Sequence, residues 1–481
     1  MHLFWHQRDL RVRDNHGLHV AARDDAVLPV YVVDEAVLST VGRRKRAFLA
    51  ACVRSLDREY GRRGGGLVVR EGSAEDVLPE LADEYGADAV VWNDHYQRAR
   101  RNRQRRVAAA CARAGIDADG RTDLVLVDPG KLPERHASHR QFHDDWQVVP
   151  KTAPYPEPDD DALVTVDEGT TDHWTTDDGT IDGETAENET TDGETTNAVD
   201  LPEAGYDAAR RRLDAFLADG VRTYAETRDD LSLAVAEPTR AVSRLSPYLA
   251  AGAIGIREVW RDVSDVYDDT SGSERRNVDK YRDELTWRER NYHLLYHEPD
   301  LRTANYRTFP NDIEWRNDED ALAAWTAGET GYPLVDAGMR QLEREGYVHN
   351  RPRQVVASFL TKHLLVDWRR GERHFADRLV DYDPASNAGN WQWTASTGTD
   401  TVAVRIFDPV SQMAKYDPDA DYVVEYVPEL RGVPAEKVVE WPTLRPSERD
   451  RLAPDYPHPI VDRDGAYDRA TAVFETALGK R

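Results

Sequence analysis

The chain has few cysteines and no long apolar run. Cys52 and Cys111 are its only cysteines, which excludes a disulfide scaffold or a cysteine-based zinc centre and favours a reducing, cytoplasmic environment. No uninterrupted apolar stretch approaches the roughly 18 residues that span a bilayer, so we expect no membrane-spanning helix. Residues 1–9 become charged too early for a cleaved secretory leader.

Positive charge is scarce as well. The chain has 63 Lys and Arg against 89 Asp and Glu, a formal net charge of -26, and only eight of the basic residues are lysines. Such acidity argues at first against a nucleic-acid partner, whose phosphates need cations. The location of the charge weakens that argument, because residues 157–200 contain 16 Asp and Glu and no Lys or Arg. The shortage of lysine and the many carboxylates are typical of a chain that stays soluble in high salt, so we expect a halophilic source.

The first 130 residues alternate short apolar runs with helix-patterned stretches such as 44–60. Strands and helices in alternation predict an α/β domain, a parallel five-stranded sheet with helices on both faces. No Gly-x-Gly-x-x-Gly follows the first run, so a dinucleotide-binding fingerprint is absent. The five predicted strands cover residues 2–5, 26–33, 67–70, 88–92 and 124–127.

The remaining sequence divides into a polar segment and a helical one. Residues 157–200 are rich in Thr, Asp, Glu and Gly and cannot bury enough apolar surface to order, so we expect a disordered acidic insertion. Helical periodicity follows over 208–217 and 336–345, and 355–366 is apolar on nearly every side, which predicts a buried core helix. We therefore expect three parts: the α/β domain over 1–130, a linker with the insertion over 131–204, and an all-α domain over 205–481.

Residues 381–393 combine two carboxylates, several amides and two indoles beside a glycine, an unusual composition for a packing helix. Asp381 and Asp383, if buried, need partners, and Arg351 and Arg353 are candidates. The alternative interpretation is a structural ion pair beside core tryptophans.

Glu284, Trp287 and Arg288 are spaced by three and four residues, so on a helix a carboxylate, an indole and a guanidinium can face one cavity. The alternative is a surface ion pair beside a core indole. Residues 243–247, SRLSP, place hydroxyls and free backbone N–H groups at a helix start, where a phosphate can bind. An ordinary helix cap would have the same sequence.

Residues 340–378 carry nine Lys and Arg against five Asp and Glu, a local excess of positive charge in an acidic chain. Together with Trp287 and Trp393 as aromatic plates, this basic face suits an unstacked nucleic-acid base.

These motifs together resemble the photolyase/cryptochrome family, most closely the microbial photolyases that act on cyclobutane pyrimidine dimers. The similar stretches are FWHQRDLR at 4–11, SRLSPYL at 243–249, WRE at 287–289 and NWQWTASTGTD at 390–400. The resemblance extends over residues 2–150 and 205–478. It implies an N-terminal α/β domain with an antenna chromophore, a long linker, and a helical domain that binds FAD.

The resemblance also implies roles for individual residues. FAD would be bound by Tyr224, Val242, Ser243, Arg244, Leu245, Ser246, Arg353, Asp381, Tyr382, Asp383 and Asn387, with Asn387 placed against flavin N5. The catalytic residues at the lesion would be Glu284, Trp287, Asn387 and Trp393. Electrons would pass along Trp315, Trp368 and Trp391. DNA would contact Arg228, Glu284, Trp287, Arg288, Asn291, Asn350, Arg351, Gln354, Arg405, Gln412 and Lys415.

The activity that the resemblance implies is light-dependent repair of cyclobutane pyrimidine dimers in UV-damaged DNA. An electron from excited, reduced FAD would reach a lesion flipped out of the duplex. We expect a cytoplasmic monomer that needs no metal. Two alternatives stay open: a cryptochrome-type blue-light photoreceptor, including a DASH-like one that prefers single strands, and a flavin protein that only carries electrons.

Three residues depart from the pattern of the best-matching photolyases. Gln354 stands where they usually have Met and where the cryptochrome-DASH branch has Gln, and Val242 removes a Thr hydroxyl from the phosphate loop. Ala108 stands where folate-binding relatives carry Glu. With the halophilic composition, this favours 8-hydroxy-5-deazaflavin over methenyltetrahydrofolate as the antenna chromophore.

Overall fold

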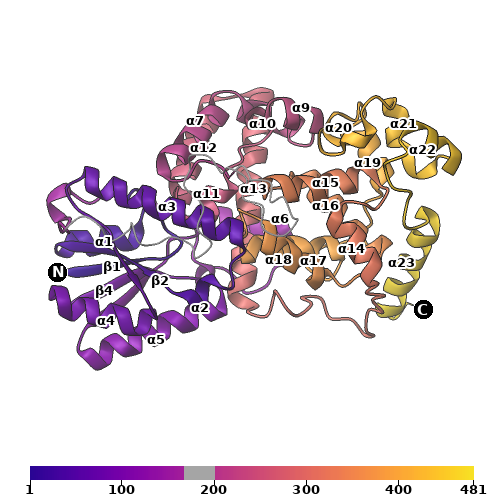
Figure 1. The fold of residues 1–481 in the computed structure, drawn as a ribbon. Coiled ribbons are helices and arrows are strands. Elements are labelled where there is room, and N and C mark those ends of the chain that lie inside the picture. The colour runs from indigo at the N-terminus through magenta and orange to yellow at the C-terminus, as the bar shows by residue number, and fades with distance from the viewer. Residues whose placement is uncertain (167–200, 481) are drawn as a thin grey trace, which may run out of the picture.

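The computed structural model describes residues 1–166 and 201–480, and its two ends lie at opposite ends of the molecule (Figure 1). The N-terminal part contains a sheet of five parallel strands in the order β3-β2-β1-β4-β5. The strands are β1 His2–His6, β2 Val27–Val33, β3 Val68–Glu71, β4 Ala89–Asn93 and β5 Asp117–Arg121. The predicted parallel five-stranded sheet is therefore confirmed.

Helices cover both faces of this sheet because side chains alternate between the faces along each strand. Leu3 and Trp5 of β1 pack in one core cluster with residues of α4 and α5, whereas Phe4 packs in another with residues of α1 and α3. Figure 1 shows these two pairs of helices on opposite sides of the strands. The helices of this part are α1 His16–Asp24, α2 Glu35–Leu38, α3 Arg43–Arg62, α4 Ala74–Tyr85 and α5 Arg98–Ala114.

The prediction of the fifth strand at 124–127 is wrong. The fifth strand is β5, whose sequence DADGR has no apolar alternation because it lies at the edge of the sheet. The apolar run that follows packs instead against the helix α13 (Gly272–His297). There Glu289 Oε2 accepts hydrogen bonds from the backbone N–H groups of Leu126 at 2.9 Å and Val127 at 3.2 Å. Burial against a helix, and not pairing with a strand, accounts for the apolar run.

The described part of the linker before residue 167 contains η1 Pro129–Lys131, α6 His139–Gln147 and η2 Asp160–Ala162. The disordered insertion was expected from 157, but Leu163 is buried and forms a parallel bridge with Val27 of β2. Val164 N donates to Val27 O at 3.0 Å, which fixes this part of the linker on the sheet. The rest of the expected insertion, residues 167–200, lies outside the described residues. The division of the chain at 130 and 205 stays a prediction.

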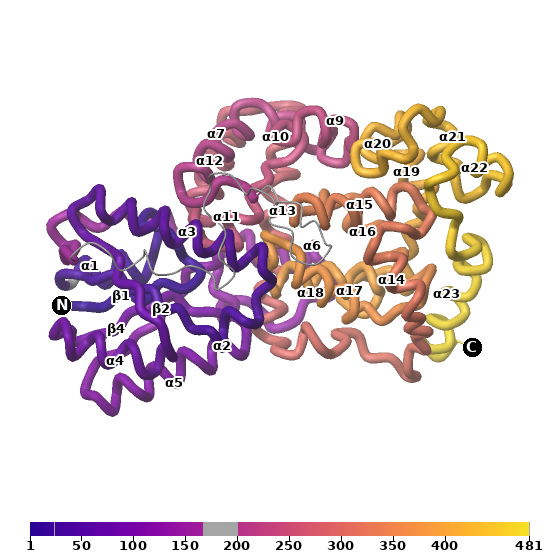
Figure 2. The backbone as a smooth tube through the Cα atoms, viewed as in Figure 1, coloured from indigo at the N-terminus to yellow at the C-terminus, as the bar shows by residue number. Residues whose placement is uncertain are grey.

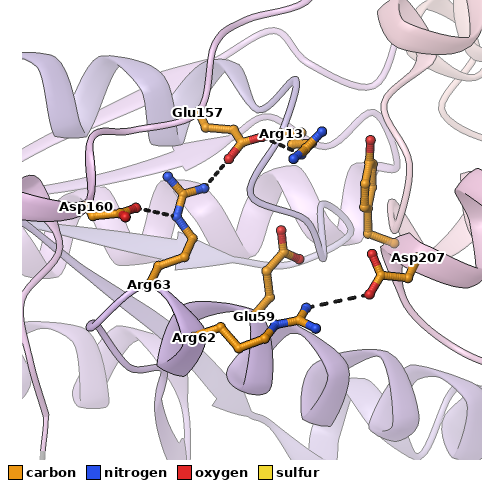
Figure 3. A pocket seen from close by; sticks show the side chains of 8 residues that line it. Arg13, Glu59, Arg62, Arg63, Glu157, Asp160 and Asp207 are labelled. Atoms are coloured by element: carbon orange, nitrogen blue, oxygen red, sulfur yellow. Dashed lines mark hydrogen bonds and ion pairs between the residues drawn. The ribbon is translucent and has the colours of Figure 1, made fainter.

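A cavity of about 350 Å³ lies where α3, the linker and α7 meet. It is lined by Arg13, Glu59, Arg62, Arg63, Glu157, Asp160, Tyr206 and Asp207. Figure 3 shows Arg63 between the carboxylates of Glu157 and Asp160, and Arg62 directed at Asp207. Burial, and then the charges of Asp207 and Glu157, raise the pKa of Glu59 to about 7.

The part of the chain from residue 205 is helical, as its periodicity predicts. Figure 2 shows α13 and α18 at the centre of the molecule, between the sheet and the last helices. Within residues 1–166 and 201–480, no helix is long and apolar enough to cross a membrane. The elements are α7 Tyr206–Ala218, η3 Gly220–Arg222, α8 Tyr224–Thr227, α9 Leu231–Ala236, α10 Pro238–Ala241, α11 Ser246–Ala251, α12 Ile256–Asp269, α13 Gly272–His297, α14 Glu319–Ala327, α15 Pro333–Glu345, α16 Asn350–Ser358, η4 Phe359–His363, α17 Trp368–Arg378, α18 Pro384–Ala395, α19 Pro409–Tyr416, α20 Asp421–Tyr426, η5 Pro428–Leu430, α21 Ala435–Val439, η6 Trp441–Thr443, α22 Pro446–Leu452 and α23 Arg463–Ala477.

The core segment 355–366 is buried throughout, as predicted, but it is not one helix. The α-helix α16 ends at Ser358 and a π-helical turn, η4, follows, with Leu364 N donating to Phe359 O at 3.0 Å. Leu365 then adopts a left-handed φ of 51°, which ends the helical path. A segment that is apolar on every side carries no periodicity from which such a change of hydrogen-bond register could be predicted.

Candidate active site

A chain of polar contacts joins Glu284 of α13 to Gln354 of α16. Glu284 Oε1 accepts a hydrogen bond from Arg228, which also lies 3.7 Å from the carboxylate of Asp229. Asp229 Oδ2 accepts from Arg351 Nη2 at 2.7 Å, and Arg351 Nη1 donates to Gln354 Oε1 at 2.8 Å. Four residues that the resemblance assigns to DNA, from three separate segments, therefore form one surface with Asp229. We call these five residues the polar chain.

Trp287 lies one turn along α13 from Glu284 and is half-buried. Its indole stacks on the imidazole of His139 from α6, with ring centroids 3.7 Å apart and planes 9° from parallel. Arg288 does not join Glu284 and Trp287 at one cavity, as its spacing suggests. Its guanidinium donates to the carbonyl of Leu124 at 2.9 Å and lies 4.7 Å from the ring centre of Tyr292, so it holds the two parts of the chain together.

The predicted anion-binding loop precedes the short helix α11. Tyr281 donates its hydroxyl to Ser243 Oγ at 3.0 Å, and the ring of buried Tyr224 meets that of Tyr281 edge-on at 5.1 Å. Arg244 has a left-handed φ of 48° and pairs with Glu345 at 3.0 Å. Around them Val242 is half-buried, Leu245 is buried in the core, and Ser246 begins α11. The loop is thus held in one conformation by its own side chains.

Arg353 lies 3.5 Å from Asp381, which confirms this predicted pairing. The other candidate, Arg351, instead pairs with Asp229, as described above. Asp381 is buried, and its Oδ1 has no hydrogen-bond partner among the described residues. A buried carboxylate oxygen without a partner is costly, so this atom is suited to a bound group that donates to it.

Asp383 is held by Arg8 from the first strand-loop segment, a partner that sequence reasoning missed. Asp383 Oδ2 accepts from Arg8 Nη2 at 2.7 Å and from the Tyr292 hydroxyl at 2.6 Å, and its Oδ1 caps α18 at Ser386 N. Burial alone would raise the pKa of Asp383, but the Arg8 charge and the Tyr292 hydrogen bond offset burial and hold it well below its usual value. Tyr382, beside it, accepts Lys45 Nζ on its carbonyl at 2.6 Å. This cluster ties the sheet domain to the start of α18.

A pocket opens between α16 and α18, with Arg353, Gln354, Asn387 and Trp391 among its walls. Asn387 Nδ2 donates to the carbonyl of Glu372 at 3.2 Å, which leaves its amide oxygen available. The full lining is Asn350, Arg353, Gln354, Ala357, Asn387, Asn390, Trp391 and Thr394. The polar chain ends at this pocket, at Gln354. Arg353, also in its wall, pairs with Asp381 Oδ2, and Asp381 Oδ1 is the open oxygen. The pocket itself is small, about 10 Å³, and forms only one edge of the candidate site. The groups around it suit FAD in kind, because Asp381 Oδ1 and Asn387 offer polar contacts and Trp391 offers an apolar wall.

The three tryptophans assigned to electron transfer share one core. Trp391 and Trp368 are buried in it, Trp315 packs against it half-buried, and Trp368 Nε1 donates to Asn305 at 2.9 Å. Trp391 also meets Trp325 edge-on at 6.2 Å, a neighbour that the sequence did not identify.

The remaining predicted DNA contacts fall into two groups. Trp393 is half-buried with the guanidinium of Arg405 4.6 Å from its ring centre, Gln412 is half-buried, and Lys415 and Asn350 are exposed. Asn291 is different, because it is buried against Gly389 of α18. The structure therefore does not bring Asn291 or Arg288 to this surface.

The sequence matches the patterns of both parts of one family. Residues 2–159 match DNA photolyase, and residues 281–476 match the FAD binding domain of DNA photolyase. The chain belongs to the DNA photolyase/cryptochrome family.

Curated relatives match along almost the whole chain. A deoxyribodipyrimidine photo-lyase from Halobacterium salinarum is 40% identical and covers 100% of both chains, and one from Synechococcus is 36% identical over 96% of this chain and 94% of its own. A cryptochrome DASH from Natronomonas pharaonis is 34% identical over 96% of this chain and 98% of its own.

Solved structures agree in fold. A class III photolyase from Agrobacterium tumefaciens has a TM-score of 0.85 at 32% identity, over 100% of this chain and 98% of its own. An archaeal photolyase from Sulfolobus tokodaii, solved with two FAD molecules, has a TM-score of 0.79 at 30% identity, over 99% of each chain.

Proposed function

We propose that the chain is a deoxyribodipyrimidine photo-lyase, which uses light to repair cyclobutane pyrimidine dimers in DNA. The full-length relatives with that name support the proposal. The observation that carries it is the polar chain, which connects two carboxylates and two guanidinium groups to Gln354, a residue in the wall of the pocket that Asn387 and Trp391 also line. A flavin protein that only carried electrons would not need such a surface.

FAD is the cofactor of the helical domain in this proposal, held by Tyr224, the 242–246 loop, Arg353, residues 381–383 and Asn387. Reduced FAD supplies, on absorbing light, one electron that the dimer needs for its ring to split and that returns afterwards, so the reaction is redox-neutral. The chain positions the cofactor: Asp381 offers its open oxygen as an acceptor, and Asn387 offers its amide oxygen. The Arg8–Asp383 pair fixes the start of α18, on which Asn387 and Trp391 lie.

The lesion is flipped out of the duplex, and this costs less free energy for a damaged pair than for an intact one. It then binds beside the polar chain. Trp287 and Trp393 contact its two pyrimidines by stacking. Glu284 accepts a hydrogen bond from a pyrimidine N–H, and Lys280, 2.9 Å from Glu284 Oε1, holds that carboxylate together with Arg228. Arg351, Arg405, Gln412, Lys415 and Asn350 hold the surrounding strand.

Trp391, Trp368 and Trp315 carry an electron inward to reduce the flavin. Burial supports Trp315 as the outermost of the three, because Trp391 and Trp368 are buried and Trp315 is only half-buried. Indole is readily oxidised, so spaced indoles can relay single electrons through a core that excludes water.

The antenna chromophore in this proposal is 8-hydroxy-5-deazaflavin. Ala108 is half-buried against the apolar cluster under α4 and α5, where it offers no carboxylate to a folate. Solvent extraction of the protein followed by mass spectrometry identifies the chromophore, and a second FAD, as in the Sulfolobus tokodaii structure, would contradict this choice.

A DASH-like preference for single strands is the second candidate. Gln354 favours it, because the cryptochrome-DASH branch has Gln at this position and the side chain accepts a hydrogen bond from Arg351 of the polar chain. Repair of the same dimer in single-stranded and duplex oligonucleotides separates the two, since the first candidate repairs both.

The test gives the reduced, FAD-loaded protein a thymine-dimer oligonucleotide in darkness and in blue light. We expect restored thymines only in the light, measured by chromatography of the digested strand. An absence of light-dependent restoration would refute the proposal. A cytoplasmic location and a monomeric state stay predictions, which cell fractionation and light scattering measure.

A further inference from the structure

Two histidines and an aspartate meet outside the pocket, between α6 and α13. His139 Nε2 lies 2.9 Å from Asp283 Oδ1, and His143 Nδ1 lies 3.7 Å from the same oxygen. One ligand atom from each residue lies within 4.8 Å of the other two, and all three residues are half-buried. The sequence did not reveal this group because Asp283 follows the histidines by about 140 residues.

The local structure presents the three side chains to one point. His139 and His143 are four residues apart on α6, so they share a face, and Ser138 caps that helix by accepting from Gln141 N at 3.2 Å. Asp283 comes from α13, which packs against α6. Two helices therefore fix the three side chains before any ligand binds.

The chemistry of the group matches a borderline transition metal. Two imidazole nitrogens and one carboxylate oxygen are the donors of one class of catalytic zinc site, in which bonds are roughly 2.0–2.2 Å and water takes the open position.

Lys280 places a positive charge next to the proposed cation site. Its Nζ lies 2.6 Å from Asp283 Oδ2 and 2.9 Å from Glu284 Oε1. Lys280 thus occupies the outer oxygen of Asp283 and leaves Oδ1 to the two histidines. Among the described residues, His143 Nδ1 has no hydrogen-bond partner although it is buried, so it is free to coordinate.

We propose that His139, His143 and Asp283 bind one divalent transition metal of the zinc class, with the remaining position taken by water. Such an ion joins the linker to the helical domain. It also fixes His139, whose ring stacks on Trp287 at 3.7 Å, and so holds one face of Trp287 in place.

The consequence for DNA rests on the function proposed above, in which Trp287 contacts the lesion. A wall that is already fixed loses less conformational entropy on binding, so the metal should tighten lesion binding. The site itself does not depend on that function, because metal binding is measured without DNA.

The test is a calorimetric titration of Zn²⁺ into the full chain with FAD, after dialysis against a chelator. We expect one zinc per chain, and at least about 10-fold weaker binding in His143→Ala and in Asp283→Asn, since even residues behind the ligands change affinity by that much. The control is His458→Ala, an exposed histidine paired with Asp450 elsewhere, which should bind zinc as the parent does. Flavin absorbance and circular dichroism verify that each variant folds.

Two results would overturn the metal site: no saturable zinc binding by the parent, or equal affinity in the parent and His143→Ala. X-ray absorption spectroscopy at the zinc edge gives a second readout. We expect scattering from two imidazoles, and an absence of imidazole scattering would overturn the assignment. For the coupling, zinc should tighten binding of a thymine-dimer oligonucleotide by about 2- to 10-fold in the parent and not in His143→Ala. Equal binding with and without zinc overturns the coupling, while repair by the zinc-free enzyme reports separately on the proposed function.

Discussion

Asp383→Asn removes the counter-charge of Arg8 at the joint between the sheet domain and α18. Arg8 is nearly buried, and Asp383 is its only carboxylate partner among the described residues, at 2.7 Å. The other acceptors of Arg8 are neutral, the Ala250 carbonyl at 3.0 Å and the Tyr292 hydroxyl at 3.1 Å. The variant keeps the shape of the side chain and leaves a guanidinium in the interior without a charge to balance it.

The expected loss is about 3–5 kcal/mol of unfolding free energy, the usual cost of removing one partner from a buried ion pair. Removing both charges should cost less than removing one, because no uncompensated ion then stays buried. The double variant Arg8→Met, Asp383→Asn is therefore expected to recover about 1–3 kcal/mol relative to Asp383→Asn alone.

Urea unfolding at pH 7, followed by tryptophan fluorescence, measures these free energies, and flavin absorbance reports whether the FAD pocket stays intact. Acid is a second perturbation of the same pair. The pKa of Asp383 is lowered in the folded state, so its stabilisation is present above the unfolded pKa of about 4 and is lost as the pH falls below it. The reasoning is refuted if the double variant is no more stable than Asp383→Asn.

Three further changes test other parts of the molecule. Glu59→Gln removes a carboxyl whose folded pKa is raised to about 7, so the variant should gain up to about 2–3 kcal/mol of unfolding free energy above pH 7 and nothing below about pH 3.5, where both states are protonated. Urea unfolding across this range measures the gain, with exposed Glu80→Gln as the control, and a pH-independent difference contradicts the cause. Trp391→Phe should block photoreduction of oxidised flavin yet leave repair by chemically reduced enzyme nearly intact. Trp325→Phe, at its edge-on neighbour, is the control and should keep both activities. Equal loss of both activities in Trp391→Phe argues against a relay. Glu284→Ala should lower repair per absorbed photon roughly 10-fold or more at unchanged flavin content, with Glu274→Ala on the same helix as control, and loss of flavin would instead place Glu284 at the cofactor.

The sheet and most helices could be predicted because burial on one face leaves a period of 2 or 3.6 in the sequence. This periodicity is absent where burial has another cause. Residues 124–127 are apolar because they meet Glu289 and α13, and β5 is polar because it is an edge strand. Leu163 packs on β2 although its surroundings are acidic and rich in turn residues. A local pattern cannot tell which distant element covers a segment.

The same limit applies to the candidate site. Arg353 could be predicted as a partner of Asp381 because a buried carboxylate needs a cation or a hydrogen-bond donor beside it. Similarity of motifs located Glu284 and Asn387. Arg8, however, reaches Asp383 across 375 residues, and Asp283 reaches His139 across 144. Nothing in the spacing of such residues records the contact, which is created by the docking of the sheet domain and linker onto α13 and α18.

The net charge of -26 gains a sharper meaning from these contacts. Of the five cations that the resemblance assigns to DNA, four lie at this surface, and three of the four, Arg228, Arg351 and Arg405, already contact the carboxylates of Glu284, Asp229 and Asp400. Lys415 is the fourth. If all four cations released counterions on binding duplex DNA, the slope of log affinity against log salt would be about −3.6. Because DNA phosphates only replace carboxylates at three of them, we expect a slope of about −1, carried by Lys415. Fluorescence anisotropy of a dimer-containing duplex over a salt series measures it, and a slope steeper than about −3 would show that these ion pairs do not persist in solution. A shallow slope is what a chain that binds DNA in high salt requires, and it leaves stacking on Trp287 and Trp393 as the main source of affinity.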